Sequence, residues 1–190
     1  MTLLENILKA NSAFVEQTAN QAEENISKYP QRKLAIVTCM DTRLVSLKEE
    51  ALGLNRGDVK VIKNAGNSVI GNFGETIRSL VIAIFSLYVE EIIILGHSDC
   101  GVAQANSQDI INKMLQRNIS ADAIKLIEDE LQHWLDNYKN PVQNLLDVVE
   151  KIYNNPLIPK DVPIHGLLID PNTGKLNVVV NGYDKIPKEN

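Results

Sequence analysis

The chain has 190 residues, of which 44% are hydrophobic, so it can bury one core of domain size, and its length favours a single domain over 1–190. Lys and Arg number 19 against 24 Asp and Glu, a net charge of −5, which gives no electrostatic reason to expect nucleic acid or a membrane as partner. No secretory signal or bilayer-length apolar run is evident. We therefore expect a cytoplasmic protein that acts on a small molecule.

The amino-terminal segment predicts a helical arm over residues 1–30. Apolar side chains recur with helical spacing between polar ones from residue 2 to about 28, which indicates one or two helices. Pro30 ends the segment. The apolar face of this arm has no evident place in the core of the same chain.

Short β-branched runs predict strands at 34–38, 59–62 and 91–95. Between the second and third strands a helix is expected over 74–89, with Asn72 as its N-cap and Glu75 completing an approximate capping box. Strand, helix and strand in this order indicate a parallel βαβ unit. Further helices are expected over 108–117, 120–138 and 141–153.

The carboxyl-terminal tail predicts a hairpin. Strands at 163–169 and 175–180 flank a turn rich in Asp, Pro, Asn and Gly at 170–174. The fold class expected is α/β, with a mainly parallel central sheet of about four strands, flanking helices and an added C-terminal strand or hairpin.

Two clusters of chemically active side chains follow the first and third predicted strands. Cys39, Asp41 and Arg43 come directly after the first strand, and an extended backbone would place them on one side. His97 and Cys100 follow the third strand, and their three-residue spacing lets them converge within one turn. Either cluster alone is a weak signal, because a cysteine after a strand is usually a small apolar residue.

Together the clusters predict a metal site. The carboxyl ends of parallel strands meet at one edge of a sheet, where ligands bind at a topological switch point. Two thiolates and an imidazole suit Zn²⁺, and three protein ligands with one exchangeable position are typical of a catalytic site. Asp41 is the contender for the fourth position.

These residues resemble a known family. Cys-x-Asp-x-Arg at 39–43 followed by His-x-x-Cys at 97–100 resembles the β-class carbonic anhydrases, and the stretch 63–66 is similar to their glycine-bearing loop, with Lys63 where we expect arginine. The short length, the His-Ser-Asp-Cys-Gly form and the stretch 51–58 are most similar to the compact, archaeal-style branch. The resemblance covers about 33–102 and the final hairpin, and only loosely the helical region between them.

The resemblance implies a zinc lyase. It implies zinc bound by Cys39, His97 and Cys100, with Asp41 and Arg43 as a dyad beside the open position. The implied activity is the reversible hydration of carbon dioxide to bicarbonate by a zinc-bound hydroxide. It also implies a homodimer in which the amino-terminal helices wrap the partner.

Charge counting predicts a pH-dependent role for Asp41. Two thiolates already cancel the charge of zinc, so a bound carboxylate would make the complex anionic and leave no position for water. We expect Asp41 to close the site as a fourth ligand at acidic pH, and Arg43 to recapture it at alkaline pH.

Two other functions stay open. A hydrolase of carbon disulfide or carbonyl sulfide would use the same zinc hydroxide, and a non-catalytic zinc or thiol regulatory protein would use the same cysteines. Asp41 and Arg43 argue against the regulatory protein, which needs no carboxylate at an open position.

The remaining candidate residues have ordinary structural interpretations. Asp99 satisfies local backbone donors, His133, Trp134 and His165 pack or lie on the surface, and Gly66 and Gly71 serve backbone conformation.

Overall fold

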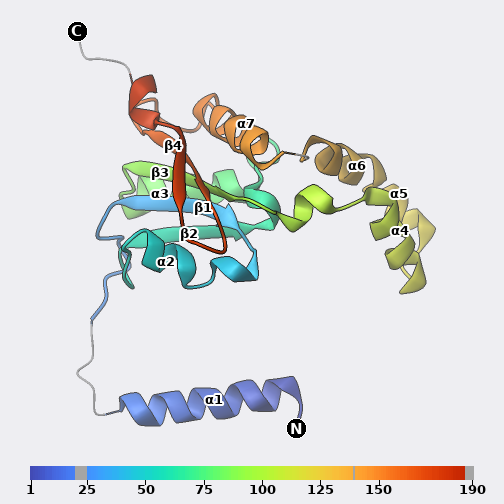
Figure 1. Cartoon of the computed structure of the whole chain (residues 1–190), viewed down its shortest axis with the longest axis horizontal. Helices are drawn as coiled ribbons and strands as arrows, with labels where there is room; N and C mark the ends of the chain where they lie inside the picture. Colours follow the sequence, from blue (N-terminus) through green and yellow to red (C-terminus); the bar gives the residue numbers. More distant parts are fainter. Residues whose placement is uncertain (20–24, 139, 187–190) are drawn as a thin grey trace.

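The computed structural model describes residues 1–19, 25–138 and 140–186. Its centre is a five-stranded sheet in the order β2-β1-β3-β4-β5 (Figure 1). The strands are β1 Leu34–Cys39, β2 Val59–Asn64, β3 Glu91–His97, β4 Ile164–Ile169 and β5 Leu176–Val180. The first four are parallel, and β5 pairs antiparallel with β4. This confirms the predicted parallel sheet with a C-terminal hairpin.

The strand order creates a switch point between β1 and β3. The chain places β2 on one side of β1 and then returns to place β3 on the other side. Cys39 is the last residue of β1 and His97 the last residue of β3. The Thr38 hydroxyl donates a buried hydrogen bond of 3.0 Å to the carbonyl oxygen of Leu95, which ties the two strands together just before Cys39 and His97. The sheet thus brings the two predicted clusters to one edge.

Helices cover both faces of the sheet. The α-helices are α1 Leu3–Thr18, α2 Leu47–Ala51, α3 Glu75–Leu87, α4 Ser107–Gln116, α5 Ala121–Lys125, α6 Glu128–Asn137 and α7 Pro141–Tyr153, and the 3₁₀ turns are η1 Thr42–Leu44, η2 Ala65–Asn67, η3 Gly101–Gln104 and η4 Gly182–Lys185. Ala35 and Val37 of β1 pack into a core with α3 and α7, whereas Ile36 packs into a second core that includes Cys39 and Cys100. Burial on both faces explains the continuous apolar run of β1.

Two predicted helix boundaries were wrong. Gly74, not Asn72, is the N-cap of α3, because the amide of Arg78 donates to the Gly74 carbonyl oxygen and opens the helix there. The helix expected over 120–138 is two helices, α5 and α6, because the backbone of Ile127 has a φ of −125° and leaves the helical region.

The amino-terminal helix α1 contains no buried residue. Thr2 caps it, and the Thr2 amide donates to the Glu5 carboxylate, which completes a capping box. The rest of the predicted arm includes 20–24, which lies outside the described residues, and 25–28, which is not helical. Within the described ranges, no helix has the length and apolar character needed to cross a membrane.

Candidate metal centre

The three predicted ligands converge at the carboxyl edge of the sheet. One ligand atom each from Cys39, His97 and Cys100 lies within 4.8 Å of the other two, and the two sulfur atoms are 3.9 Å apart. All three side chains are buried, with His97 fully enclosed. Water therefore does not compete for these donors, and the cluster could hold a metal ion.

The imidazole of His97 presents a free nitrogen to the two sulfurs. Its Nδ1 lies 2.8 Å from the carbonyl oxygen of Ser98, and since a carbonyl only accepts, Nδ1 carries the proton. Its Nε2 is buried without a hydrogen-bond partner among the described residues. An unpaired buried nitrogen is costly, and a bound cation would satisfy it. A backbone carbonyl on the opposite nitrogen is the usual way to orient a metal-binding histidine.

The two cysteines form an electrostatically coupled pair. Their shared hydrogen bond and burial raise the pKa of Cys39, and the same hydrogen bond lowers the pKa of Cys100. Burial also disfavours the charged form of His97, but Cys100 outweighs it and raises the His97 pKa. The surroundings of Cys100 therefore favour its thiolate, the form that binds metals.

Asp41 is held by Arg43 beside the cluster. Arg43 donates to Asp41 Oδ1 from its backbone amide (2.8 Å) and its Nε (3.1 Å), and to Oδ2 from Nη2 (2.8 Å). These bonds lower the pKa of Asp41 to about 2 although burial opposes the shift. Asp41 Oδ2 lies 3.8 Å from His97 Nε2. An ionised carboxylate therefore stands at the edge of the candidate metal position.

The route by which Arg43 reaches Asp41 differs from the predicted one. The stretch after β1 does not stay extended, because residues 42–44 form the 3₁₀ turn η1, with Asp41 as its N-cap. The Asp41 side chain accepts the Arg43 amide within this turn. The turn, not a strand period of two, brings the guanidinium back over the carboxylate.

The interpretation of Asp99 as a local backbone acceptor was wrong. Arg43 donates from Nη1 to Asp99 Oδ2 and from Nη2 to the Asp99 carbonyl oxygen, both at 2.8 Å. Gln104 Nε2 donates to the other carboxylate oxygen at 2.9 Å. Asp99 adopts a φ of +53°, which turns it toward Arg43. The arginine is therefore held by two carboxylates, those of Asp41 and Asp99.

A cavity of about 560 Å³ opens beside the cluster. Cys39, Asp41, Arg43 and Cys100 contribute its polar part, and the rest is largely apolar: Met40, Ala65, Val102, Ala105, Ile110 and Leu135. The cavity can therefore admit a small apolar molecule to the face of the cluster where Asp41 lies.

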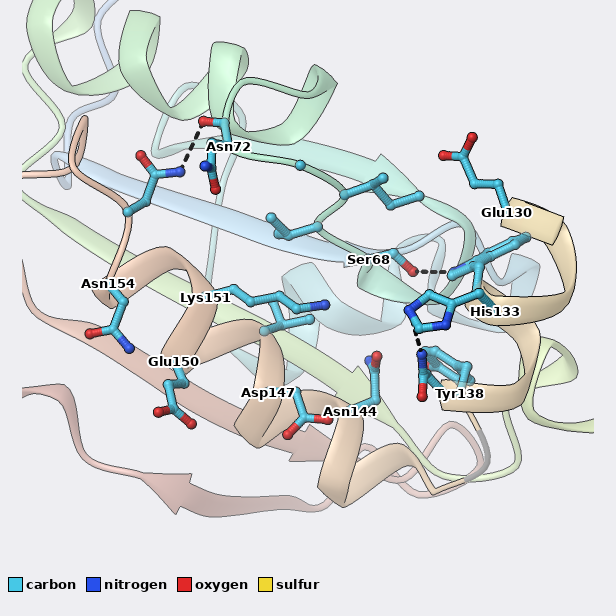
Figure 2. Close-up of a pocket in the computed structure, with 17 residues that line it drawn as sticks. Ser68, Asn72, Glu130, His133, Tyr138, Asn144, Asp147, Glu150, Lys151 and Asn154 are labelled. Carbon is cyan, nitrogen blue, oxygen red and sulfur yellow. Dashed lines mark hydrogen bonds between the residues drawn. The ribbon is translucent and has the colours of Figure 1, made fainter. Parts of the chain in front are cut away.

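A second cavity, of about 680 Å³, lies on the other side of α6. It is lined by the loop 68–72 and by residues of α6 and α7. Figure 2 shows His133 and Tyr138 toward one end of this cavity and Asn72 toward the other. His133 is exposed, as predicted, whereas Trp134 lines both cavities and donates from Nε1 to Ser68 Oγ at 3.1 Å. Trp134 thus forms part of the wall between them.

The two loop glycines differ in role. Gly66 has a φ of +69°, and a Cβ at this position would lie 2.6 Å from Cε2 of Tyr138, so both conformation and space require glycine. Gly71 has a φ of +65° and open space around it, so conformation alone accounts for it. Lys63 is exposed on the edge strand β2 and does not line the metal cavity among the described residues.

His165 belongs to a separate interaction on β4. Its Nδ1 accepts the amide of Gly182 at 3.1 Å, and its Nε2 lies 2.9 Å from Glu91 Oε1. It fixes the end of the chain against β3 and takes no part in the metal cluster, as the sequence predicted.

Comparison with known proteins agrees with the fold. The sequence profile of the family described as carbonic anhydrase matches residues 34–176. A crystal structure of β-carbonic anhydrase isoform I from Trichomonas vaginalis superposes with a TM-score of 0.92 at 44% identity, covering 96% of this chain and 100% of that chain.

Two other relatives are informative. YvdA of Bacillus subtilis, which has the words carbonic anhydrase in its name, is 41% identical over 187 residues, 97% of this chain and 94% of its own length. The carbon disulfide hydrolase of Acidithiobacillus thiooxidans is 33% identical over 156 residues, 76% of each chain. The family profile, the fold and these identities agree, and the chain therefore belongs to the β-class carbonic anhydrase family of enzymes.

Proposed function

We propose that this enzyme binds one zinc ion through Cys39, His97 and Cys100 and interconverts carbon dioxide and bicarbonate. The donor set supports zinc, because thiolate sulfur and imidazole nitrogen are its preferred ligands. The unpaired Nε2 of His97, buried next to two sulfurs, is the observation that carries the assignment. Three ligands leave one position for a reactant, which is the arrangement of a catalytic site.

The residues around the cluster have distinct roles in this proposal. Bound zinc would supply a water molecule of lowered pKa as the nucleophile. Asp41, ionised and 3.8 Å from His97 Nε2, would accept a hydrogen bond from that water and so orient it toward the substrate. Arg43 keeps Asp41 in this orientation and in its charged form. Asp99 anchors Arg43 from behind.

Asp41 has a second role in this proposal. Its carboxylate is engaged by three donors of Arg43, and in this position it would leave the fourth site on a bound zinc ion free for a reactant. Release from Arg43 would let Asp41 close that position as a fourth ligand. Arg43 would keep its bonds to Asp99 in that state, so the movement does not leave the arginine unpaired.

The apolar cavity supports a small linear substrate. Its walls are aliphatic near the cluster, so an uncharged molecule enters without losing hydrogen bonds to water. Bicarbonate, the charged product, would meet Arg43 at the cavity edge. Carbon disulfide and carbonyl sulfide are the rival substrates, since a related protein is named carbon disulfide hydrolase.

Stopped-flow assays on zinc-quantified protein test the proposal. We expect rapid hydration of CO₂ that scales with zinc content, and slow or no hydrolysis of carbon disulfide in parallel assays. Hydrolysis of carbon disulfide faster than hydration of CO₂ would assign the rival activity. Stoichiometric zinc with neither reaction would favour the non-catalytic regulatory protein.

We also propose that residues 1–190 act as one domain whose arm, residues 1–30, joins two copies into a homodimer. Six large apolar side chains of α1 are more than half exposed: Leu3, Leu4, Ile7, Leu8, Phe14 and Val15. Figure 1 shows α1 apart from the sheet, and no residue of the helix is buried. An apolar helix face of this size is typical of a surface that a partner covers.

The variant Ile7→Asp tests the homodimer. It places a charge on the apolar face of α1, so self-association at micromolar concentration should weaken at least tenfold and unfolding should occur at lower temperature. Lys9→Asp, on the polar face, is the matched control and should leave association unchanged. Sedimentation velocity measures both. A wild-type protein that is monomeric at these concentrations would contradict the proposal.

A further inference from the structure

The hydroxyl group of Tyr138 is a buried polar group without an assigned role. The side chain is 2% exposed and packs in the same cluster as Cys39 and Cys100. Its hydroxyl oxygen has no hydrogen-bond partner among the described residues. A buried unpaired hydroxyl costs free energy, so a tyrosine at this position requires an acceptor that a phenylalanine would not need.

The backbone around Tyr138 is shaped to admit the ring beside the cysteines. Gly66 leaves the space that the ring fills, since a Cβ there would lie 2.6 Å from Cε2 and 3.0 Å from Cζ. Asn144 Nδ2 donates to the Gly66 carbonyl oxygen at 3.1 Å and holds the loop in this position. The hydroxyl-bearing end of the ring is therefore fixed by the loop after β2 and by α7.

We propose that Tyr138 is a positioning residue that donates a hydrogen bond to the thiolate of Cys100 in the metal-loaded enzyme. The proposal rests on the zinc site proposed above. Cys100 and Tyr138 pack in the same buried cluster, and a thiolate sulfur is an acceptor that the hydroxyl otherwise lacks.

The two cysteines would then differ in their supporting donors. Cys39 interacts with the backbone of Gly66 and Asp41, whereas Cys100 interacts with the Val102 backbone and with the side chains of Cys39, His97 and Tyr138. Of these side chains, Tyr138 is the one that is not a proposed ligand. Only the side-chain donor can be removed by substitution without moving the backbone. A hydrogen bond to a ligand sulfur withdraws electron density from it, so the metal keeps more positive charge. Tyr138 would thus offset part of the charge that two thiolates donate to the metal.

The variant Tyr138→Phe, with cobalt(II) in place of zinc, tests this inference. Loss of the hydrogen bond makes the sulfur more electron-rich, so the near-ultraviolet thiolate-to-cobalt charge-transfer band should move to longer wavelength. Zinc affinity should fall about tenfold, and the zinc-loaded variant should unfold about 2–4 °C lower. Tyr153→Phe is the matched control, because Tyr153 donates its hydroxyl proton to the Lys185 carbonyl oxygen, far from the cluster.

The band position decides the outcome. A band that moves in Tyr138→Phe and stays in place in Tyr153→Phe supports the hydrogen bond. An unmoved band in a folded, cobalt-loaded Tyr138→Phe variant overturns it. A rise in the unfolding temperature of that variant would also count against the hydrogen bond, because it would show that the hydroxyl is unpaired in the wild-type protein. Absence of any thiolate-to-cobalt band in the wild-type protein would instead refute the metal site itself.

Discussion

Replacement of Cys100 by alanine is expected to remove zinc and CO₂ hydration together. Zinc sites of this kind are held by about 10–16 kcal/mol, so one of four ligands accounts for roughly 3 kcal/mol, or about a hundredfold in affinity. The substitution removes the negative charge of the Cys100 thiolate, so only Cys39 and His97 would remain to bind the metal. Metal analysis after dialysis and stopped-flow hydration measure the two effects. Alanine at Cys39 or His97 should act in the same way.

Ile169→Val is the control for the Cys100 variant. Ile169 is fully buried in the same apolar cluster but offers no ligand, so its truncation should cost about 0.5–1.5 kcal/mol of folding stability and leave zinc bound. If a folded Cys100→Ala protein retained stoichiometric zinc, Cys100 would have to be removed from the proposed ligand set.

Arg43→Ala is expected to retain zinc but to lose most turnover. Within the part of the chain that the structure describes, the Arg43 side chain hydrogen-bonds to Asp41 and Asp99 and to none of the three proposed ligands. Without it, Asp41 is free to rotate and to occupy the fourth zinc position, so turnover should fall about 10²-fold or more. Arg32→Ala removes a different arginine–aspartate pair, with Asp58, and should leave turnover near wild type. Wild-type rates in Arg43→Ala would refute the role of the dyad.

The same variant should move the titration of Asp41. Arg43 holds the Asp41 pKa at about 2, below the ordinary value of 3.8, so this carboxylate stabilises the fold above about pH 4 and that contribution is lost as pH falls through about 2. In Arg43→Ala the pKa should rise toward 3.8. Carboxyl ¹³C NMR of metal-free protein measures this directly. An Asp41 that titrates near 4 in the wild type would contradict the ion pair.

Local sequence patterns were sufficient for the sheet and for the ligand cluster. The strands are short β-branched runs, and the parallel arrangement places the residues that follow β1 and β3 at one edge, which is why Cys39, His97 and Cys100 meet. The hairpin follows from turn residues at 170–174, which lie between two apolar runs. These signals are periodic or adjacent in the chain, so no tertiary information is needed to interpret them.

The partners of the dyad could not be read from local patterns. Asp99 has a backbone φ of +53°, and its carboxylate contacts Arg43. No local sequence pattern predicts this left-handed conformation at Asp99. Tyr138 directly follows α6, and its ring packs against Gly66, a residue far away in the sequence. The break at Ile127 has no proline or glycine to signal it. The requirement for glycine at position 66 was the available clue to a close neighbour, but it does not identify that neighbour.

The most direct test of the proposed zinc centre is X-ray absorption at the zinc K-edge of the purified protein near neutral pH. The proposal predicts two sulfur ligands at about 2.3 Å and two nitrogen or oxygen ligands at about 2.0–2.2 Å, one of them the His97 imidazole. The Cys100→Ala variant, loaded with excess zinc, should show at most one sulfur. A wild-type first shell without sulfur, or with the same sulfur count in the variant, would contradict the assignment of Cys39, His97 and Cys100 as the metal ligands.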